Sequence, residues 1–379
     1  MQVDSAQLYR MRLPFRQSFK HALAERQSSE SLLLHLTASV DGEVVSGFGE
    51  ALPRAYVSGE TLEQTEAAIR QFLPALSQVA FQSVGDIARF CEAFESRFEQ
   101  QQCARTLLEL ALLDLLSKVR KTPLADWFGG LQAGRIQYSA VVSDEAPTAL
   151  AKLVEQMRGF AVGPLKLKVG RDLKRIHQQL ELLRTAYPDN DIRLDANGAW
   201  EDVPAADAAQ IIERFAISCL EQPAIVTDTQ ALVTVHGRIK SRCDVRIVLD
   251  EQVRLRPVLQ QLIQAQVLDC LNIKISKVGG LLNALQFHQM ASAAGLQCQL
   301  GANVGESSLM TSAAQLFAGL TGDLIYHEGA YGTLLLEQDL CEPPVMFDAA
   351  LQADVSRFAT ALGWGVGPLD LAHPGLQAL

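Results

Sequence analysis

The sequence lacks any apolar run long enough to cross a membrane. No stretch approaches the ~18 uninterrupted apolar residues of a transmembrane helix. Residues 1–15 contain neither the apolar core nor the small-residue cleavage site of a signal peptide. We therefore expect a cytoplasmic protein that has no membrane partner.

Clusters of basic residues are also absent, and the formal net charge of the chain is −10. This balance argues against a nucleic-acid partner or an anionic membrane surface. The seven cysteines are scattered and odd in number, and none are spaced as C-x-x-C. A disulfide framework and a zinc site are therefore both disfavoured, and we expect reduced, buried thiols.

A third absence is the glycine-rich phosphate-binding turn that an open dinucleotide-binding sheet carries after its first strand. From about Gln137 onwards, short runs typical of strands alternate with helical stretches, which predicts parallel β-α-β units. The eight strand candidates are IQYSAVV, PLKLKV, DIRLDAN, SCLEQP, VRIVLD, LNIKIS, LQCQLG and DLIYHE. Eight strands over ~200 residues favour a closed (β/α)8-type barrel.

The residues before and after this alternation show different patterns of predicted secondary structure. Residues 1 to about 55 are predicted to form strands, with a hairpin turn at Asp41-Gly42. Residues 61–118 are predicted to form helices, and the apolar stretch TLLELALLDLLSKV suits a helix that is packed on several sides. We predict an α/β protein with an α+β capping domain over residues 1–125, a barrel over 126–340, and a C-terminal segment over 341–379 that returns to the first domain.

Polar residues gather at the carboxyl ends of the predicted barrel strands, where barrel enzymes carry their active sites. In chain order they are Lys166, Lys168, Asp195, Asn197, Glu221, Asp250, Glu251, Asn272 and Lys274. Taken singly, each has an ordinary explanation, such as a helix cap or turn for an aspartate and a solvated position for a lysine.

Three of these residues, Asp195, Glu221 and Asp250, end successive strands and are expected to converge on one point. Without a counter-charge, three carboxylates would repel one another in a partly dry cavity. A small divalent cation held by hard oxygen ligands removes that cost. We therefore expect Mg²⁺, with Mn²⁺ as an alternative.

The lysines suggest the chemistry. Strands two and six of an eight-stranded barrel lie opposite each other, so Lys168 and Lys274 are expected to face each other across the barrel mouth. Lys166 shares a face with Lys168, because side chains two apart in a strand point the same way. A neighbouring cation and partial burial both lower a lysine pKa, so we expect Lys166 to make Lys168 a better base. A metal with two opposed bases suits removal of a proton α to a carboxylate through an enediolate.

These motifs resemble the enolase superfamily, and within it the muconate-lactonizing-enzyme subgroup. The matching segments are Lys166-Leu-Lys168, Asp195-Ala-Asn197, Glu221-Gln-Pro223, Asp250-Glu251, Asn272-Ile-Lys274 and Lys277-Val-Gly-Gly280. GFGEALP over residues 47–53 and LLELALLDL over residues 107–115 look like the capping domain of that family. The resemblance therefore covers nearly the whole chain.

The resemblance implies roles for these residues. Asp195, Glu221 and Asp250 would bind Mg²⁺, and Lys168 and Lys274 would be the acid/base pair. Supporting roles would fall to Lys166, Asn197, Glu251 and Asn272. The family's Asp-Glu-Ser motif reads Asp-Glu-Gln here, with Gln252 in the third place, which keeps the metal ligand. A lysine rather than a histidine at the sixth strand separates the chain from the mandelate-racemase and sugar-acid-dehydratase branches.

The subgroup uses one framework for muconate cycloisomerisation, o-succinylbenzoate synthesis, N-acylamino-acid racemisation and dipeptide epimerisation. We expect an isomerase that epimerises or racemises a dipeptide or an N-acylamino acid. A muconate-type cycloisomerase or an o-succinylbenzoate synthase-type lyase are alternatives on the same residues. A non-catalytic metal-binding barrel is the alternative outside enzymes, and the intact lysine pair argues against it. We expect a homo-oligomer that acts on a small carboxylate substrate.

Substrate recognition in such enzymes comes from loops of the capping domain and from the last barrel strands. The loop RQSFKHALAE offers Phe19 and His21, and the loop LPRAYVSGET offers Arg54 and Tyr56. The second loop resembles that of dipeptide epimerases, which also carry Asp-x-Asp after the eighth strand to hold the substrate ammonium. This chain has Tyr-His-Glu there, ending at Glu328.

We expect Glu328 to hold an ammonium group, or Arg54 to recognise an acidic or acylated distal group of the substrate. Glu306 is a further candidate for a substrate contact.

Overall fold

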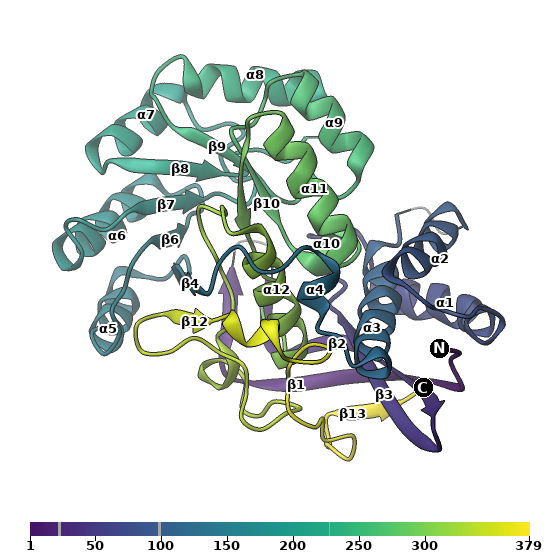
Figure 1. Ribbon diagram of the computed structural model, residues 1–379. Helices are drawn as coiled ribbons and strands as arrows, with labels where there is room; N and C mark the ends of the chain where they lie inside the picture. Colours follow the sequence, from purple (N-terminus) through teal and green to yellow (C-terminus); the bar gives the residue numbers. More distant parts are fainter. Residues whose placement is uncertain (22–23, 98–99, 227) are drawn as a thin grey trace.

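The computed structural model describes residues 1–21, 24–97, 100–226 and 228–379, and the side chains of residues 18–21 and 24–25 lie outside this description. Figure 1 shows two parts, an antiparallel sheet with helices α1 to α3 beside it, and a curled parallel sheet surrounded by helices. No helix among the described residues has both the length and the apolar character needed to span a membrane.

The N-terminal sheet is antiparallel, with the strand order β13-β1-β2-β3. Its strands are β1 (Ser5–His21), β2 (Ala24–Val40), β3 (Glu43–Ala51) and β13 (Leu376–Ala378). Asp41 and Gly42 join β2 to β3 with positive φ angles of 51° and 86°, as a two-residue hairpin turn requires. The predicted hairpin is confirmed. The predicted return of the C-terminal tail is also confirmed, because β13 pairs with β1.

Helix α3 (Gln102–Arg120) lies against this sheet and is buried on nearly all sides, as its apolar sequence predicts. A Cβ atom at Gly47 or Gly49 of β3 would collide with the backbone of α3, so the close approach requires glycine there. The remaining helices of this part are α1 (Leu62–Phe72), the 3-10 helix η1 (Leu73–Gln78), α2 (Val84–Arg97) and α4 (Leu124–Trp127).

Seven parallel strands form the second sheet, in the order β11-β10-β9-β8-β7-β6-β5. They are β5 (Ala140–Val142), β6 (Leu165–Lys168), β7 (Ile192–Asp195), β8 (Ile217–Glu221), β9 (Arg246–Leu249), β10 (Cys270–Ile273) and β11 (Gln297–Leu300). The helices that alternate with them are α5 (Pro147–Met157), α6 (Leu173–Ala186), α7 (Ala205–Arg214), α8 (Thr229–Lys240), α9 (Arg256–Gln264), α10 (Ile275–Val278), α11 (Leu281–Ala293) and α12 (Ser308–Thr321). This alternation confirms the predicted α/β barrel.

The eighth predicted strand is a pair of isolated bridges instead of a regular strand. His327 forms parallel bridges to Tyr138 on one side and to Leu300 on the other, and so closes the barrel between its first and last strands. The predicted strand IQYSAVV is divided, because β4 (Arg135–Gln137) leaves the barrel and pairs with β12 (Gln352–Asp354) of the tail. The backbone NH groups of Tyr138 and Ser139 donate to Leu351 and His327 respectively, which separates the two halves.

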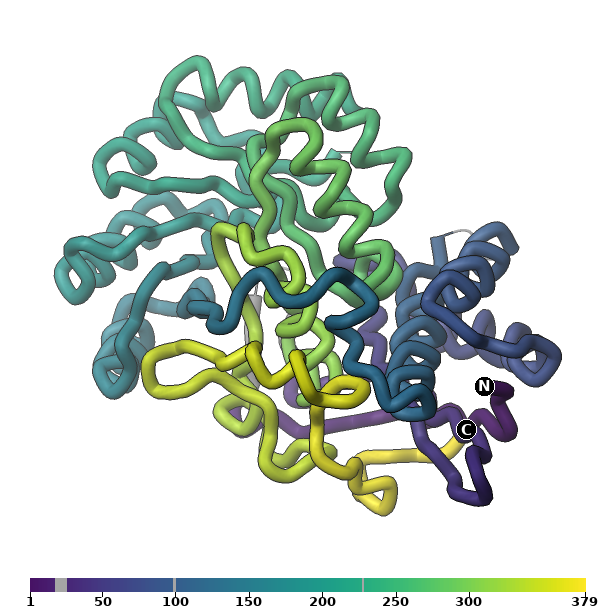
Figure 2. Tube along the Cα trace, in the orientation of Figure 1, coloured from purple at the N-terminus to yellow at the C-terminus, as the bar shows by residue number. Residues whose placement is uncertain are grey.

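The tail after α12 is largely irregular. It contains the 3-10 helices η2 (Gly332–Leu334) and η3 (Ser356–Ala359). Figure 2 traces it from the barrel back to the N-terminal sheet, where the carbonyl oxygen of Leu379 accepts a hydrogen bond from Gln7 Nε2 at 3.0 Å. The division of the chain at residues 125 and 340 stays a prediction.

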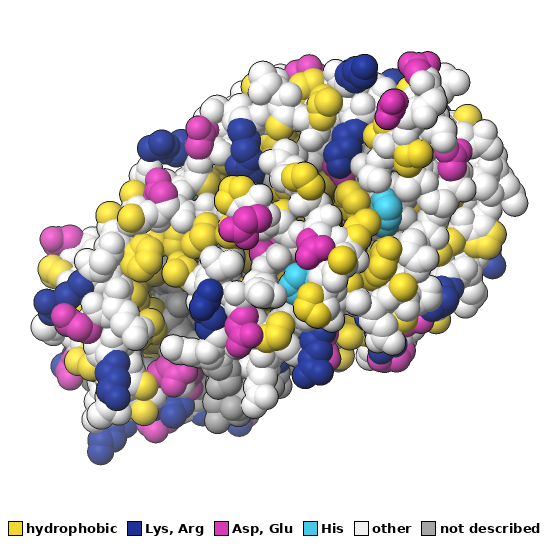
Figure 3. Space-filling view, turned by 90° about the horizontal axis from the view of Figure 1, so that it is seen from below, with side chains coloured by type: hydrophobic (Ala, Val, Ile, Leu, Met, Phe, Trp, Pro, Cys, Tyr) yellow, Lys and Arg dark blue, Asp and Glu magenta, His cyan; other side chains and the backbone are white. Residues whose placement is uncertain are grey.

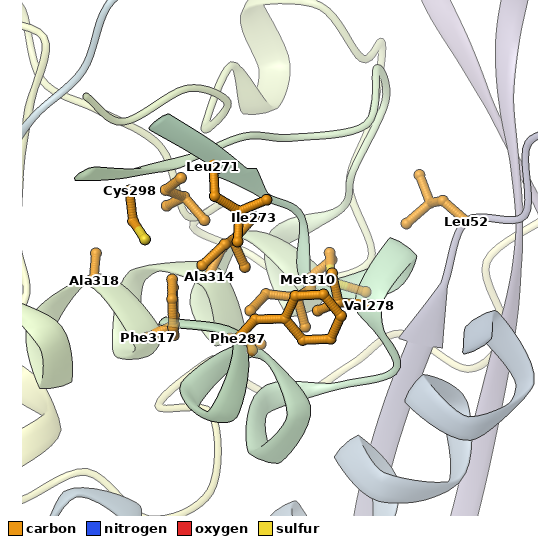
Figure 4. Close-up of a cluster of buried hydrophobic side chains, with 14 of the residues drawn as sticks. Leu52, Leu271, Ile273, Val278, Phe287, Cys298, Met310, Ala314, Phe317 and Ala318 are labelled. Atoms are coloured by element: carbon orange, nitrogen blue, oxygen red, sulfur yellow. The ribbon is translucent and has the colours of Figure 1, made fainter. Parts of the chain in front are cut away.

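One hydrophobic core runs from the N-terminal sheet into the barrel. Figure 4 shows part of it, with Leu271 and Ile273 of β10, Phe287 of α11 and Met310 of α12. A closely packed protein core has low compressibility. Because the two sheets share this core, it holds them in one fixed relation. The loops of the N-terminal part thereby keep a defined position over the barrel mouth.

Candidate active site

Charged side chains lie at the carboxyl ends of β6 to β10, as the sequence predicts. In the sheet register Lys168 stands beside Asp195, and Asp195 stands beside Glu221. Asp195, Glu221 and Asp250, the residue after β9, are each only 1% exposed. Three buried carboxylates therefore occupy the ends of three adjacent strands.

Ammonium groups contact two of these carboxylates. Lys168 Nζ lies 2.7 Å from Asp195 Oδ2, and Lys274 Nζ lies 2.5 Å from Asp250 Oδ2. Lys277 Nζ donates to Asp250 Oδ1 at 2.9 Å. Burial alone would raise the pKa of both carboxyl groups, but the ammonium charges outweigh it. They lower the pKa of Asp195 to about 2 and hold the pKa of Asp250 well below its usual range.

Glu221 is held mainly by neutral amides. Asn272 Nδ2 donates to its Oε1 at 2.8 Å, and Gln299 Nε2 donates to its Oε2 at 2.9 Å. The nearest ammonium, that of Lys166, is 3.4 Å away. Burial raises the pKa of Glu221 above its usual value. Of the three carboxylates, Glu221 is therefore the one whose ionised form a bound cation would stabilise most.

A cavity of about 550 Å³ opens at this end of the barrel, and Lys168 and Lys274 both line it. Lys168 belongs to the second barrel strand and Lys274 follows the sixth, so the two approach from opposite sides. Burial lowers the pKa of Lys274, but the charges of Asp250 and Glu251 outweigh burial and raise the pKa above its ordinary value.

Lys166 also lines the cavity, but it is paired with carboxylates. Its Nζ lies 2.6 Å from Glu328 Oε2 and 3.4 Å from Glu221 Oε2. Burial lowers the pKa of Lys166, and the neighbouring carboxylates more than reverse this, so the pKa lies well above its usual value. The expected effect of Lys166 on the pKa of Lys168 stays a prediction.

Asn197 and Glu251 connect the two sides of the site. Lys168 Nζ donates to Asn197 Oδ1 at 3.1 Å, and Asn197 Nδ2 donates to Glu251 Oε1 at 2.9 Å. Burial, followed by the charge of Asp250, raises the pKa of Glu251 to about 7. Glu251 Oε2 is buried and has no hydrogen-bond partner among the described residues. Such an oxygen is open to a water molecule, a ligand or an ion as its partner.

Within the described part of the chain, no group of three or more His, Cys, Asp or Glu side chains is already arranged to hold a metal ion. Ammonium groups contact the oxygens of Asp195 and Asp250 instead. The donor chemistry nevertheless fits a hard divalent cation, because three carboxylates from adjacent strands stand beside the unpartnered oxygen of Glu251. A cation and the two ammonium groups would compete for the same oxygens.

Two further buried residues, Lys277 and Arg193, complete the site. Lys277 Nζ donates to the carbonyl oxygens of Asp250 and Asn272 at 2.6 and 2.9 Å. Arg193 donates to Gln299 Oε1 and to Ser139 Oγ, each at 2.8 Å. A signal for Arg193 was present, because it precedes Asp195 by two positions in β7 and so shares its face.

The expected substrate contacts have different outcomes. Tyr56 and Glu306 line the cavity. Phe19 and His21 lie in the segment whose side chains are outside the described residues. Burial raises the pKa of Glu306 to about 8, so this side chain is mostly neutral at pH 7. Its Oε1 accepts a hydrogen bond from the backbone NH of Asn303 at 2.7 Å.

The structure corrects the expectation for Arg54. Its side chain is buried, and Nη1 donates to the backbone carbonyl oxygens of Glu30 and Pro53 at 2.6 and 2.9 Å. Arg54 does not belong to the cavity lining formed by the described residues. Its guanidinium therefore fastens the loop to β2 instead of facing a substrate.

The expected role of Glu328 as the partner of a substrate ammonium stays a prediction. The side chain lines the cavity, is only 6% exposed and contacts two cations. Lys166 Nζ lies 2.6 Å from Oε2, and Arg193 Nη2 lies 3.2 Å from Oε1. Lys166 and Arg193 compete with a substrate ammonium for this carboxylate, while its Oε1 has no hydrogen-bond partner among the described residues.

Comparisons with known proteins agree with this geometry. Residues 149–369 match the family described as enolase C-terminal domain-like. An N-succinyl-L-Arg/Lys racemase of Bacillus cereus is 27% identical over 316 residues, which are 83% of this chain and 83% of the relative. A chloromuconate cycloisomerase of Cupriavidus pinatubonensis is 26% identical over 345 residues, which are 88% of this chain and 89% of the relative.

A solved structure shows the same fold. The crystal structure of a dipeptide epimerase from Cytophaga hutchinsonii, complexed with Mg and the dipeptide D-Ala-L-Val, matches with a TM-score of 0.86 at 23% identity. The match covers 100% of this chain and 99% of that one. The segment matched by the family spans more than half of this chain and contains all the strand ends from Lys166 to Lys274. The chain therefore belongs to the enolase superfamily, and within it to the muconate-lactonizing-enzyme subgroup, as an isomerase.

Proposed function

We propose that the chain removes and returns the proton α to the carboxylate of a dipeptide or an N-acylamino acid, and so epimerises or racemises it in a Mg²⁺-dependent reaction. The observation that carries this proposal is the lysine pair. Lys168 and Lys274 line one cavity from opposite strands, beside three carboxylates. Inversion at carbon needs a proton-transfer group on each face of the substrate, whereas a dehydration needs only one base.

In this proposal Asp195, Glu221 and Asp250 hold Mg²⁺ or Mn²⁺. When bound, the ion supplies positive charge next to the substrate carboxylate, where negative charge grows as the α-proton leaves. The anionic state of Asp195 and Asp250 near neutral pH supports this assignment, because both pKa values are held low.

The two lysines move the proton. One of them takes it as a neutral amine from one face of the α-carbon, and the other delivers a proton as an ammonium from the opposite face. Their roles exchange for the opposite stereoisomer. Asn197 positions Lys168 by accepting its hydrogen bond at 3.1 Å. Lys166 and Arg193 both contact Glu328, which lines the cavity.

A cycloisomerase is the second candidate. Of the similar proteins, one is named a chloromuconate cycloisomerase, and that reaction would use the same carboxylates and lysines. Its product is a lactone, which proton NMR distinguishes from an epimer.

The test follows the α-proton by proton NMR in D₂O. Purified protein with MgCl₂ is incubated with a panel of L,L-dipeptides and N-acyl-L-amino acids. Exchange of the α-proton together with appearance of the opposite stereoisomer supports the proposal. Folded protein that exchanges no member of the panel contradicts it. Excess EDTA is expected to abolish exchange, and full activity in its presence would refute the metal assignment.

A further inference from the structure

The cavity continues beyond the lysines into a region that we call the apolar branch. Its walls are Val141 of β5, Leu153 and Met157 of α5, Phe160, and Leu335 and Phe347 of the tail. The tail side of the wall is ordered by aromatic contacts, with the Phe347 ring 5.5 Å from that of Tyr331 and 6.3 Å from that of Phe160. The apolar branch is therefore a defined part of the cavity between α5 and the tail.

The side chains of this wall are incompletely covered by the protein. Leu153, Met157 and Phe160 are only half-buried, and Leu334 at the cavity lining is 47% exposed. Figure 3 shows hydrophobic side chains gathered around a hollow on the face seen from below. Binding is favoured when an apolar ligand displaces water from apolar surface that faces a cavity.

Among the described residues that line the cavity, several charged side chains already contact other groups of the protein. Lys166 and Arg193 both contact Glu328. Arg16 Nε donates to the carbonyl oxygen of Thr333 at 2.6 Å. Glu145, which lies before α5 begins, is a further acidic side chain of the lining formed by the described residues.

We infer that the substrate carries a bulky, uncharged apolar group that fills the apolar branch, so that its distal part is recognised by burial and not by an ion pair. This inference rests on the proposed function for the reacting carboxylate. It names the substrate class, a carboxylate with a phenyl-sized apolar substituent beyond the α-carbon.

Four L-alanine derivatives test the inference by isothermal titration calorimetry on the Mg²⁺-loaded protein. They are 3-phenylpropanoyl-L-alanine, N-acetyl-L-alanine, N-succinyl-L-alanine and L-Phe-L-Ala. The first is expected to bind at least about tenfold more tightly than the acetyl and succinyl derivatives, as burial of a phenyl group predicts. Equal or weaker binding would overturn the inference. L-Phe-L-Ala differs from the first only by its ammonium group, so a preference for it of more than about tenfold would show ion-pair recognition and also overturn the inference.

A pair of variants locates the apolar group. Met157→Asp places a charge in the apolar branch and is expected to weaken binding of 3-phenylpropanoyl-L-alanine by about tenfold or more, while binding of N-acetyl-L-alanine stays within about twofold. Val44→Asp makes the same kind of change at a position that is 70% exposed and outside the cavity lining, and it is the matched control. Phe160→Ala is the alternative if Met157→Asp does not fold. Unchanged binding in the folded variant would place the phenyl group elsewhere and reject the inference.

Measurements of binding and of turnover distinguish a failure of the inference from a failure of the proposed function. Selective binding of 3-phenylpropanoyl-L-alanine without α-proton exchange in D₂O would support the inference and contradict the proposed function. Exchange of all four compounds with no preference in binding would support the function and contradict the inference.

Discussion

Lys168 and Lys274 are the side chains on which the proposed proton transfer depends. Lys168→Ala and Lys274→Ala are each expected to lower the rate of inversion by at least ~10²–10⁴-fold, the usual contribution of a general acid or base. Each variant is expected to retain α-proton exchange of one stereoisomer, because the base on the opposite face remains. Proton NMR in D₂O measures both quantities on separate L and D substrates.

Lys240→Ala is the matched control for these variants. Lys240 forms a partly exposed ion pair with Asp269 at 2.6 Å on α8, outside the cavity lining. Its removal is expected to leave turnover unchanged. Near-normal inversion by either of the other two variants would remove that lysine from the catalytic assignment.

Glu328 tests how the distal part of the substrate is recognised. Glu328→Gln leaves Lys166 and Arg193 without their shared carboxylate, and it is expected to lower the free energy of unfolding by about 3 kcal/mol. The value of kcat/KM is expected to fall by the same factor for L-Phe-L-Ala and for 3-phenylpropanoyl-L-alanine. A rise in KM for the dipeptide alone would identify Glu328 as the residue that binds a substrate ammonium.

Helices α3 and α11 meet at Gly280, close to the site. Glu109 of α3 pairs with Arg105 at 2.6 Å and accepts a hydrogen bond from the backbone NH of Leu282 at 2.8 Å, which anchors the start of α11. Gly280 has a φ of 103°, and a Cβ atom there would collide with the Glu109 carboxylate. The N-terminal part thereby holds the segment that follows Lys274.

Gly280→Ala is expected to lower the free energy of unfolding by about 2 kcal/mol or more, because backbone strain and a collision act together. Gly295→Ala is the matched control, since Gly295 also has a positive φ, of 74°, but has open space around its Cβ position. Strain alone is expected to cost it about 1 kcal/mol. Urea denaturation measures both, and equal losses would show that the close approach to Glu109 carries no energy.

At the scale of the whole molecule, Glu50 connects the N-terminal sheet to the barrel. Its Oε2 accepts hydrogen bonds from Ser307 Oγ at 2.5 Å and from the backbone NH of Met310 at 3.2 Å, at the start of α12. Burial is the main cause that raises the pKa of Glu50 from 4.5 to about 7. The folded protein thus binds this proton more tightly than the unfolded chain does.

Stability should therefore fall as the pH rises from about 4.5 to about 7, because the unfolded chain releases this proton over that range while the folded protein retains it. In Glu50→Gln this titration is absent. The free energy of unfolding of the natural protein minus that of the variant is expected to decrease by about 1–3 kcal/mol between pH 5 and pH 8. Urea denaturation at the two pH values measures it, and a difference independent of pH would contradict the assignment.

Much of the fold and site was predictable because the relevant patterns are local. The alternation of strands and helices predicts the barrel, and the period of two in LKLK and IRLD predicts which side chains share a face. The eighth strand was only partly predictable, because His327 forms its bridges with Tyr138 and Leu300, and neither neighbour is visible from the sequence around it.

The sequence by itself determined the fold class, the order of the charged strand ends and the opposed lysines, since parallel strands bring their carboxyl ends to one edge of the sheet. Only the tertiary structure decided which charges remain available. Arg54 and Glu328 are of the residue types that recognise charged ligands. In the structure, however, Arg54 donates to a carbonyl oxygen 24 positions away, and Glu328 accepts a hydrogen bond from a lysine 162 positions away. A charge acts on a ligand only if no partner in space has neutralised it, and such partners are distant in the chain.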